Sequence, residues 1–429
     1  MDVPVSDGRN GYGGEVTSVV DWDAAAALAG RLAPPGPVAD GATLARLVRD
    51  LRQAAGTAAE HVAQISGLRP ADGREPAQVS AVHVVDRPRW AKANAQMFAV
   101  LAGGLPTPSR VPHAGRSATA AEVGAVLALL SGKVIGQFDP YTRLSREPNE
   151  LARPSEAMEG VDERSEEHTQ LGREPDEGAE RAPKGPEGAG QGRLLLVAPN
   201  VLAVERALDV VPADFRLWVA LHEQTHALQF AAAPWLADHL RGRIDALTRA
   251  LVPDGRAAAA LVRRLLTALR DFRDVGLAAL LDDAQREAFD EVSAVMALVE
   301  GHADVMMDEV GPSVVPTVEA IRAQFEQRRD AGAATRGPAR VLRLLLGLDL
   351  KLAQYREGAG FVRAVRDRVG TDGFNAVWTS PETLPTAAEI ADPAAWVARV
   401  HTRLSREPNE LARSSEAIEG VDERSEEHG

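Results

Sequence analysis

The chain has 429 residues and a formal net charge of −14, and 45% of its residues are hydrophobic, so it is long and apolar enough for one large domain or for two or three smaller ones. Because it contains no cysteine, disulfides, thiolate metal sites and cysteine nucleophiles are excluded, and any metal must be bound by His, Asp, Glu or backbone oxygen. The sequence shows no basic patch, so nucleic acid is not an expected partner.

The N-terminal residues, MDVPVSDGRNGYGG, contain neither the basic nor the apolar segment of a secretion signal. No stretch reaches the roughly 18 consecutive apolar residues that indicate a membrane-spanning helix. We therefore expect a cytoplasmic protein without membrane contacts. Residues 1–18 are expected to be a disordered N-terminus.

Helical patterns make up the first region of the chain, residues 19–132. They are rich in residues that favour helices packed through aliphatic faces, and Gly- or Pro-rich turns separate them. The expected helices cover residues 19–33, 42–68, 86–105 and 120–132. Two short strand-like pieces follow at 133–141 and 192–202, and the simplest interpretation is a hairpin-like pair that is interrupted at its tip.

A charged insert, residues 142–192, separates the two strand-like pieces. Its first part, 142–168, recurs at 402–428 with two differences, and each copy carries four basic and eight acidic side chains. The copies have too few apolar residues to form a core, so we predict that the insert and the tail 402–429 are disordered and take no part in the chemistry. A docking motif used twice is the alternative. The sequence RSEEHT also resembles a translated sequencing adapter, which leaves an origin outside the native chain open.

Beyond residue 212 the chain is predicted to be helical to about Trp378, with a Pro-rich extended end after it. The first of these helices contains HEQTH at residues 222–226, an H-E-x-x-H motif. Pro212 and Asp214 suit its first turn, and no helix breaker follows them. One apolar stripe continues through both histidines, and its members are Phe215, Trp218, His222, His226 and Gln229.

The spacing of the two histidines predicts a metal site. Positions i and i+4 of a helix lie one above the other, so His222 and His226 can reach one ion. Glu223 points about 100° round the helix from His222, where it can accept a proton from a water at the metal. The alternative is a pair of core histidines with other partners. Two neutral imidazoles on a buried face need partners, however, and a metal supplies one to both.

A catalytic zinc normally has three protein ligands and one open position, so a third ligand must come from elsewhere in the chain. Residues 229 and 232 are Gln and Ala, which excludes the extended motif with a third histidine. The best candidate is Glu300, on a strongly helical segment that Gly311 and Pro312 end. It lies among Met and Ala side chains, where a carboxylate is costly to bury without a cation or donors nearby.

Asp304 is predicted to orient a ligating histidine without binding the metal itself. It lies one turn after Glu300, where it can accept the outer N–H of a ligating histidine and fix the orientation of that ring. Gly301 would let the two helices approach closely. A buried salt bridge to an arginine is the alternative for both carboxylates. His302 is the rival third ligand, but it projects about 200° away from Glu300, so the two cannot easily serve one ion.

Several of these segments resemble the zincin-like metallopeptidase type 2 family, which comprises bacterial proteins described as zinc-dependent metalloproteases or as deazaflavin-coenzyme-biosynthesis-associated proteins. The similar stretches include VALHEQTHALQF, VEGHAD and GRLLLVAPNVLAVERAL, and the similarity covers most of residues 20–141 and 193–400. The resemblance implies an all-helical body with a zincin active site and a peptidase-like activity. The insert and the tail depart from the family pattern.

The sequence thus predicts a mainly α fold, with a zincin-like helical body and a small β-hairpin-like element near an active site in the region 133–400. The leading hypothesis for function is hydrolysis of an amide bond in a peptide, with Zn²⁺ held by His222, His226 and Glu300 and with Glu223 as general base. A zinc hydrolase of small amides or esters is one alternative, and a non-catalytic, metal-stabilised module that binds a protein partner is another. Glu223 separates the last from the other two, because a structural site needs no acid between its histidines.

Overall fold

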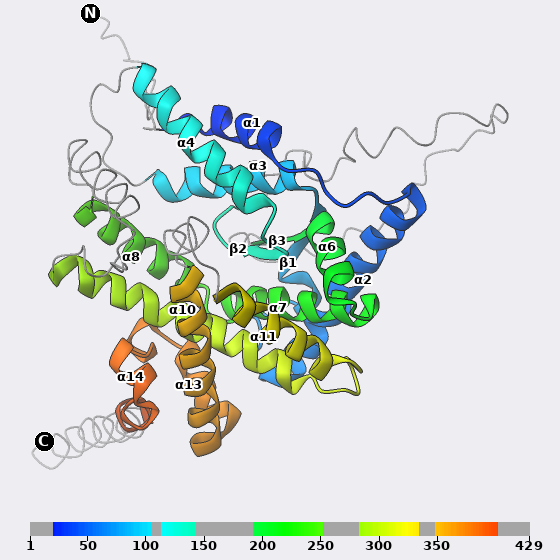
Figure 1. Cartoon of the computed structure of the whole chain (residues 1–429). Helices are drawn as coiled ribbons and strands as arrows, with labels where there is room; N and C mark the ends of the chain where they lie inside the picture. Colours follow the sequence, from blue (N-terminus) through cyan, green and yellow to red (C-terminus); the bar gives the residue numbers. More distant parts are fainter. Residues whose placement is uncertain (1–19, 104–112, 143–191, 252–282, 334–347, 402–429) are drawn as a thin grey trace, which may run out of the picture.

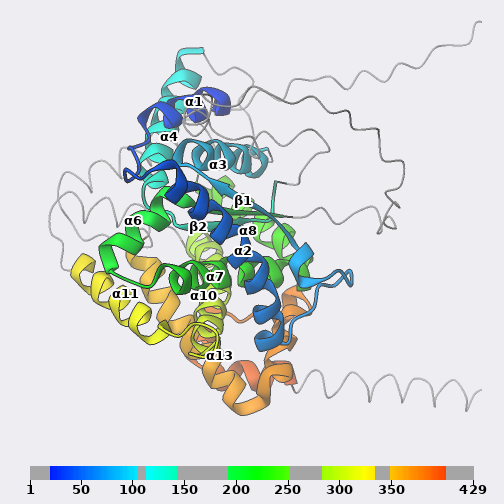
Figure 2. The same ribbon diagram turned by 90° about the vertical axis from the view of Figure 1, so that its right-hand side faces the viewer.

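The computed structural model describes residues 20–103, 113–142, 192–251, 283–333 and 348–401. Within these residues the chain is mainly helical around one small sheet, as predicted (Figures 1 and 2). The predicted N-terminal tail, charged insert and C-terminal tail lie outside the described residues, apart from Thr142 and Gly192 at the two ends of the insert. No helix in the described ranges is both long and apolar enough to cross a bilayer.

Three helices form a layer at one end of the molecule (Figure 1), namely α1 (Trp22–Leu32), α3 (Arg87–Ala102) and α4 (His113–Ser131). Two of them begin at aspartates, because the carboxylates of Asp21 and Asp86 accept backbone N–H groups of the first turns of α1 and α3. Small residues bring the helices close together. A Cβ on Gly124 of α4 would lie 2.8 Å from the carbonyl oxygen of Ala25 in α1.

The sheet has three strands in the order β1–β3–β2, with bounds β1 (Ser80–Val85), β2 (Gly136–Asp139) and β3 (Gly192–Val197). β2 and β3 are antiparallel, with Asp139 opposite Arg193, which confirms the predicted hairpin-like pair. The sequence analysis misses β1, which runs parallel to β3, although its sequence SAVHVV is rich in β-branched residues. Residues 198–202, predicted to continue the second strand, instead begin helix α6 (Ala198–Leu208), because Pro199 suits the first turn of a helix.

The larger body contains α2 (Gly41–Ser66), α7 (Pro212–Ala232), α8 (Trp235–Leu251), α10 (Asp283–Glu309), α11 (Val318–Ala333) and α13 (Leu348–Asn375). α7 lies at its centre, in contact with the sheet, α2 and α10, and the apolar side chains form one continuous core. α10 crosses α13 so closely that a Cβ on Gly301 or on Gly358 would clash with main-chain atoms of the other helix. Gly301 therefore brings α10 close to α13, and not to α7 as the sequence suggested.

The end of the chain packs on α10 and α13 in short turns and helices, where the sequence predicts an extended segment. Two 3₁₀ turns, Ala376–Trp378 and Pro381–Thr383, precede α14 (Ala387–Ala391), and residues 393–401 are helical again. Reciprocal capping explains the difference. The Thr386 hydroxyl accepts the backbone N–H of Glu389, and the Glu389 carboxylate accepts that of Thr386.

Candidate metal centre

Helix α7 carries the H-E-x-x-H motif across the centre of the molecule. The predicted apolar stripe is buried from Phe215 to Gln229, and of its members only His222 is partly exposed. The start of the helix is fixed by Asp214, whose carboxylate accepts the backbone N–H of Thr317 at 2.9 Å and its hydroxyl at 2.7 Å. The two histidines are therefore held on a rigid element, with His222 at the edge of the core.

Helix α10 brings Glu300 to the two histidines. His222 Nε2 and His226 Nε2 are 3.2 Å apart, and Glu300 Oε2 lies 3.5 Å from each of them. Glu300 and His226 are buried, and the possible ligand atoms of the three residues lie within 4.8 Å of one another. No other group of three His, Asp or Glu side chains converges in this way among the residues that the structure describes.

The chemistry of this group fits a divalent cation. Glu300 Oε2 is buried and has no hydrogen-bond partner in the described part of the chain. A buried carboxylate oxygen without a donor is costly, and this one faces the Nε2 atoms of two imidazoles whose rings meet edge-on. Two imidazoles and one carboxylate form a ligand set found in catalytic zinc sites, where a fourth position stays open.

The charges within the group depend on one another. Burial lowers the pKa of His226, but the carboxylate of Glu300, 3.5 Å away, outweighs burial and raises that pKa to about 9. Burial in turn raises the pKa of Glu300, but the nearby imidazoles of His222 and His226 hold that pKa well below its usual range. Glu300 is therefore anionic, as a metal ligand must be.

Glu223 lies on the side of α7 that faces strand β2. Its side chain is buried, and a Cβ on Gly136 of β2 would lie 2.5 Å from Glu223 Oε1. A side chain at position 136 would therefore displace this carboxylate. The sequence analysis misses Gly136, although a glycine inside a strand can indicate the close approach of another group. The charge of Glu223 also helps to raise the pKa of His226, although Glu223 is not one of the three converging side chains.

The zincin-like metallopeptidase family matches residues 20–397. The chain belongs to this family. A crystal structure from Chloroflexus aurantiacus, provisionally described as a hydrolase with a novel fold, is 26% identical, with a TM-score of 0.56 over 89% of this chain and 99% of that one. No curated protein matches the sequence significantly. Family and neighbour together support a hydrolase of the metallopeptidase type.

In this member of the zincin-like family the outer nitrogens of the two imidazoles face uncharged side chains. His226 Nδ1 lies 3.0 Å from Gln229 Oε1, and His222 Nδ1 lies 3.1 Å from Met307 Sδ. The sequence analysis assigns neither Gln229 nor Met307 a role at the site. Only the i, i+3 spacing of Gln229 from His226 on a buried stripe offered a signal for one of them.

Asp304, which the sequence predicts behind a ligating histidine, faces α11 instead. Its Oδ1 accepts Arg322 Nη1 at 2.7 Å, and its backbone carbonyl accepts Arg322 Nη2 at 3.1 Å. A bond from a guanidinium to a carboxylate is charge-assisted and stronger than one from a neutral imidazole. The salt-bridge alternative therefore describes Asp304, while Glu300 lies with the histidines.

His302, the rival third ligand, lies behind the centre and not in it. It is 1% exposed, and its Nδ1 is 2.9 Å from Gln229 Nε2. The ring stacks on Phe374 and meets Trp378 edge-on, each with ring centroids 5.4 Å apart. Burial in this apolar place, together with the charges of Arg366 and His226, lowers the pKa of His302 to about 3, so its ring is neutral.

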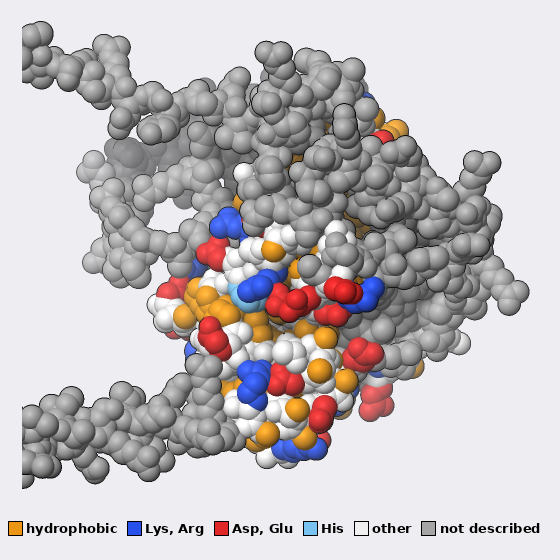
Figure 3. Space-filling view, turned by 90° about the vertical axis from the view of Figure 1, so that its left-hand side faces the viewer, with side chains coloured by type: hydrophobic (Ala, Val, Ile, Leu, Met, Phe, Trp, Pro, Cys, Tyr) orange, Lys and Arg blue, Asp and Glu red, His pale blue; other side chains and the backbone are white. Residues whose placement is uncertain are grey.

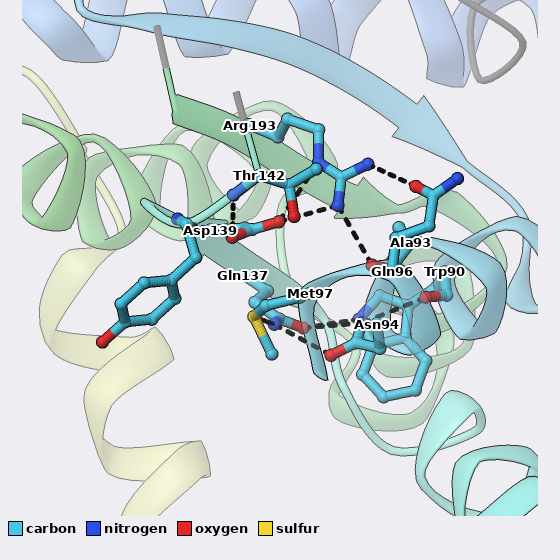
Figure 4. Close-up of polar contacts among 10 residues, drawn as sticks. Trp90, Ala93, Asn94, Gln96, Met97, Gln137, Asp139, Thr142 and Arg193 are labelled. Atoms are coloured by element: carbon cyan, nitrogen blue, oxygen red, sulfur yellow. Dashed lines mark hydrogen bonds and ion pairs between the residues drawn. The ribbon is translucent and has the colours of Figure 1, made fainter. Parts of the chain in front are cut away.

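A second buried polar cluster lies at the far end of β2 (Figure 4). Asp139 Oδ2 accepts Arg193 Nε at 3.1 Å and Arg193 Nη2 at 2.7 Å, and the side chains are 1% and 3% exposed. Asp139 Oδ1 accepts the backbone N–H groups of Tyr141 and Thr142, while Arg193 also donates to Gln96 and to a backbone carbonyl of α3. Every charged atom of this pair has a partner.

A pocket of about 670 Å³ opens on the face formed by α8, α10 and the turns before α14. Figure 3 shows this face, where acidic and basic side chains surround apolar ones. Arg243 and Glu291 pair across it at 2.9 Å, and Val295 and Leu384 line its interior. None of the three converging side chains lines the pocket, so it is separate from the metal centre.

Proposed function

We propose that the chain is a zinc-dependent hydrolase of amide bonds. The observation that carries the proposal is the convergence of His222 Nε2, His226 Nε2 and the unpartnered Glu300 Oε2. A buried carboxylate, Glu223, lies close enough for its charge to act on His226, and a purely structural site would not need it. The family and the description of the neighbour support hydrolysis as the class of reaction.

Each residue has a separate task in this proposal. When bound, zinc supplies the Lewis acid that polarises the substrate carbonyl and activates a water for attack. His222, His226 and Glu300 would hold the ion. Glu223 accepts a proton from the attacking water and delivers it to the leaving nitrogen as the C–N bond breaks, so that a carboxylic acid and an amine are released.

A peptide is the proposed substrate because a strand edge lies beside the general base. Among the described strands, β2 pairs with β3 alone, so one edge of β2 has no strand partner. An extended peptide can add to such an edge through main-chain hydrogen bonds. Gly136, which packs on Glu223, belongs to this strand, so a peptide paired there would pass close to the carboxylate. A small amide or ester would gain nothing from the edge.

The substitution Glu223→Gln tests the proposal. We expect zinc content, measured by mass spectrometry of the purified full chain, to stay at the wild-type level, while kcat/KM for peptide cleavage falls by about 10²–10⁴-fold. Glu291→Gln is the control, since that acid lies at the surface beside Arg243. Unchanged cleavage by Glu223→Gln would remove Glu223 from the mechanism. A wild-type chain that binds zinc and cleaves neither peptides nor small amides and esters would favour the non-catalytic module.

A further inference from the structure

Gln229 connects the metal centre to α10 through three hydrogen bonds. Its Oε1 lies 3.0 Å from His226 Nδ1, and its Nε2 lies 2.9 Å from both the backbone oxygen of Val299 and His302 Nδ1. The Gln229 side chain is 0% exposed, so water does not compete for these contacts. The residue joins one turn of the H-E-x-x-H helix to the turn of α10 that carries Glu300.

The backbone oxygen of Val299 decides how the amide of Gln229 is oriented. A carbonyl oxygen can only accept a hydrogen bond, so the Gln229 atom that faces it must be the NH₂ nitrogen. The amide oxygen then faces His226 Nδ1. Because an amide oxygen also only accepts, that ring nitrogen must carry a hydrogen. In the neutral ring that a metal binds, the lone pair of His226 is therefore on Nε2, which points at His222 Nε2 and Glu300 Oε2.

His302 holds the amide from the other side. The second hydrogen of the Gln229 NH₂ group points at His302 Nδ1, which must accept it and is therefore unprotonated. Phe374 and Trp378 enclose the His302 ring, so it has little room to turn. Two acceptors thus fix the two hydrogens of one amide, and the amide in turn fixes one tautomer of His226.

From this geometry we propose that Gln229 is a positioning residue of the metal centre, which holds His226 in the tautomer that presents Nε2 to a metal ion. The proposal rests on the proposed function only in taking zinc as the ion. The group that Gln229 offers to the imidazole is uncharged. A carboxylate in its place would add a negative charge behind a centre that already contains Glu300 and Glu223. The neutral amide orients the ring and makes it less basic than a carboxylate would, and so leaves more of the charge of the cation for the substrate carbonyl.

The test compares two buried glutamines of the same helix. Gln229→Met keeps the length of the side chain and removes all three hydrogen bonds. Gln224→Met is the matched control, because Gln224 is 1% exposed, donates to the backbone oxygen of Ala55 and accepts from Ser80, away from His226. We expect both variants to unfold more readily, and only Gln229→Met to bind zinc about 10–100-fold more weakly in competition with a chromophoric chelator. Equal zinc affinities for the two variants would overturn the proposal.

A second measurement needs no variant. In the zinc-loaded wild-type chain, ¹⁵N NMR of the histidine rings should show His226 bound through Nε2 and protonated on Nδ1. Binding through Nδ1 would overturn the positioning role of Gln229 and leave the proposed function standing. A chain that binds zinc through Nε2 and hydrolyses nothing would overturn the proposed function and leave the assignment standing. A chain that binds no zinc would overturn both.

Discussion

Two buried clusters of charged side chains flank strand β2, and they differ in how their charges are satisfied. At one end the carboxylate of Asp139 and the guanidinium of Arg193 have a donor or acceptor for every charged atom. Near the other end, where Gly136 packs on Glu223, the Oε2 atom of Glu300 is equally hidden from water and has no donor.

The difference separates a structural charge from a binding charge. A buried ion pair with complete hydrogen bonding needs nothing further, and removing one member leaves the other uncompensated. A buried carboxylate whose nearest neighbours are two imidazole nitrogens is instead suited to binding a cation. The two clusters should therefore respond to substitution in opposite ways, one in stability and the other in metal binding.

Asp139→Ala should have the largest effect on stability. It leaves the guanidinium of Arg193 buried without a counter-charge, which typically costs about 3–5 kcal/mol. Urea unfolding of the full chain would measure the loss, with Glu291→Gln as the control because both members of its ion pair with Arg243 are nearly half exposed. The zinc affinity of the folded variant should stay at the wild-type level. A large drop in that affinity would mean that the two clusters are not independent.

Glu300→Gln should show the reverse pattern. The amide keeps the shape of the side chain and removes its charge, so zinc should bind at least about 100-fold more weakly, because losing a ligand costs more than losing the partner of a ligand. In the absence of zinc, the free energy of unfolding should change much less than in Asp139→Ala. Glu309→Gln, on the same helix and paired with Arg366 at 2.6 Å near the surface, is the matched control. Retention of full zinc affinity by Glu300→Gln would remove it from the ligand set.

The metal centre can be predicted from the sequence much better than the Asp139–Arg193 pair. The reason is how far apart in the sequence the interacting residues lie. The i, i+4 spacing of His222 and His226 is local, so one helix is enough to bring them together, and the burial cost of Glu300 on an apolar face indicates a partner. Which neighbour each face of α10 meets depends on packing between distant segments. Asp304 therefore pairs with Arg322 of α11 and Gly301 contacts α13, although both follow Glu300 closely in the sequence. The Asp139–Arg193 pair is equally non-local.

Gly136→Ala tests whether strand β2 holds Glu223 in place. Gly136→Ala places a Cβ 2.5 Å from Glu223 Oε1, so the carboxylate must move. A displacement of about 1 Å in a catalytic group can cost roughly 100-fold in rate, and we expect kcat/KM for peptide cleavage to fall by about that factor with zinc affinity unchanged. Gly56→Ala, on α2 where a Cβ meets nothing within 4 Å, is the control. Full activity in Gly136→Ala would mean that β2 does not hold Glu223 in place.

The smallest effect is expected from replacing residues 143–191 with a short Gly/Asn/Ser turn. The strands on either side already meet, because Asp139 and Arg193 are opposite each other in the ladder and joined by their ion pair. Each halving of a flexible loop recovers only about 0.6 kcal/mol of closure entropy, so the free energy of unfolding should rise by no more than about 2 kcal/mol. Zinc affinity and kcat/KM should match the wild type, since the converging residues of α7 and α10 keep their contacts. A loss of zinc binding in a variant that unfolds normally in urea would mean that residues 143–191 take part in the metal centre. The two clusters would then not be independent of each other.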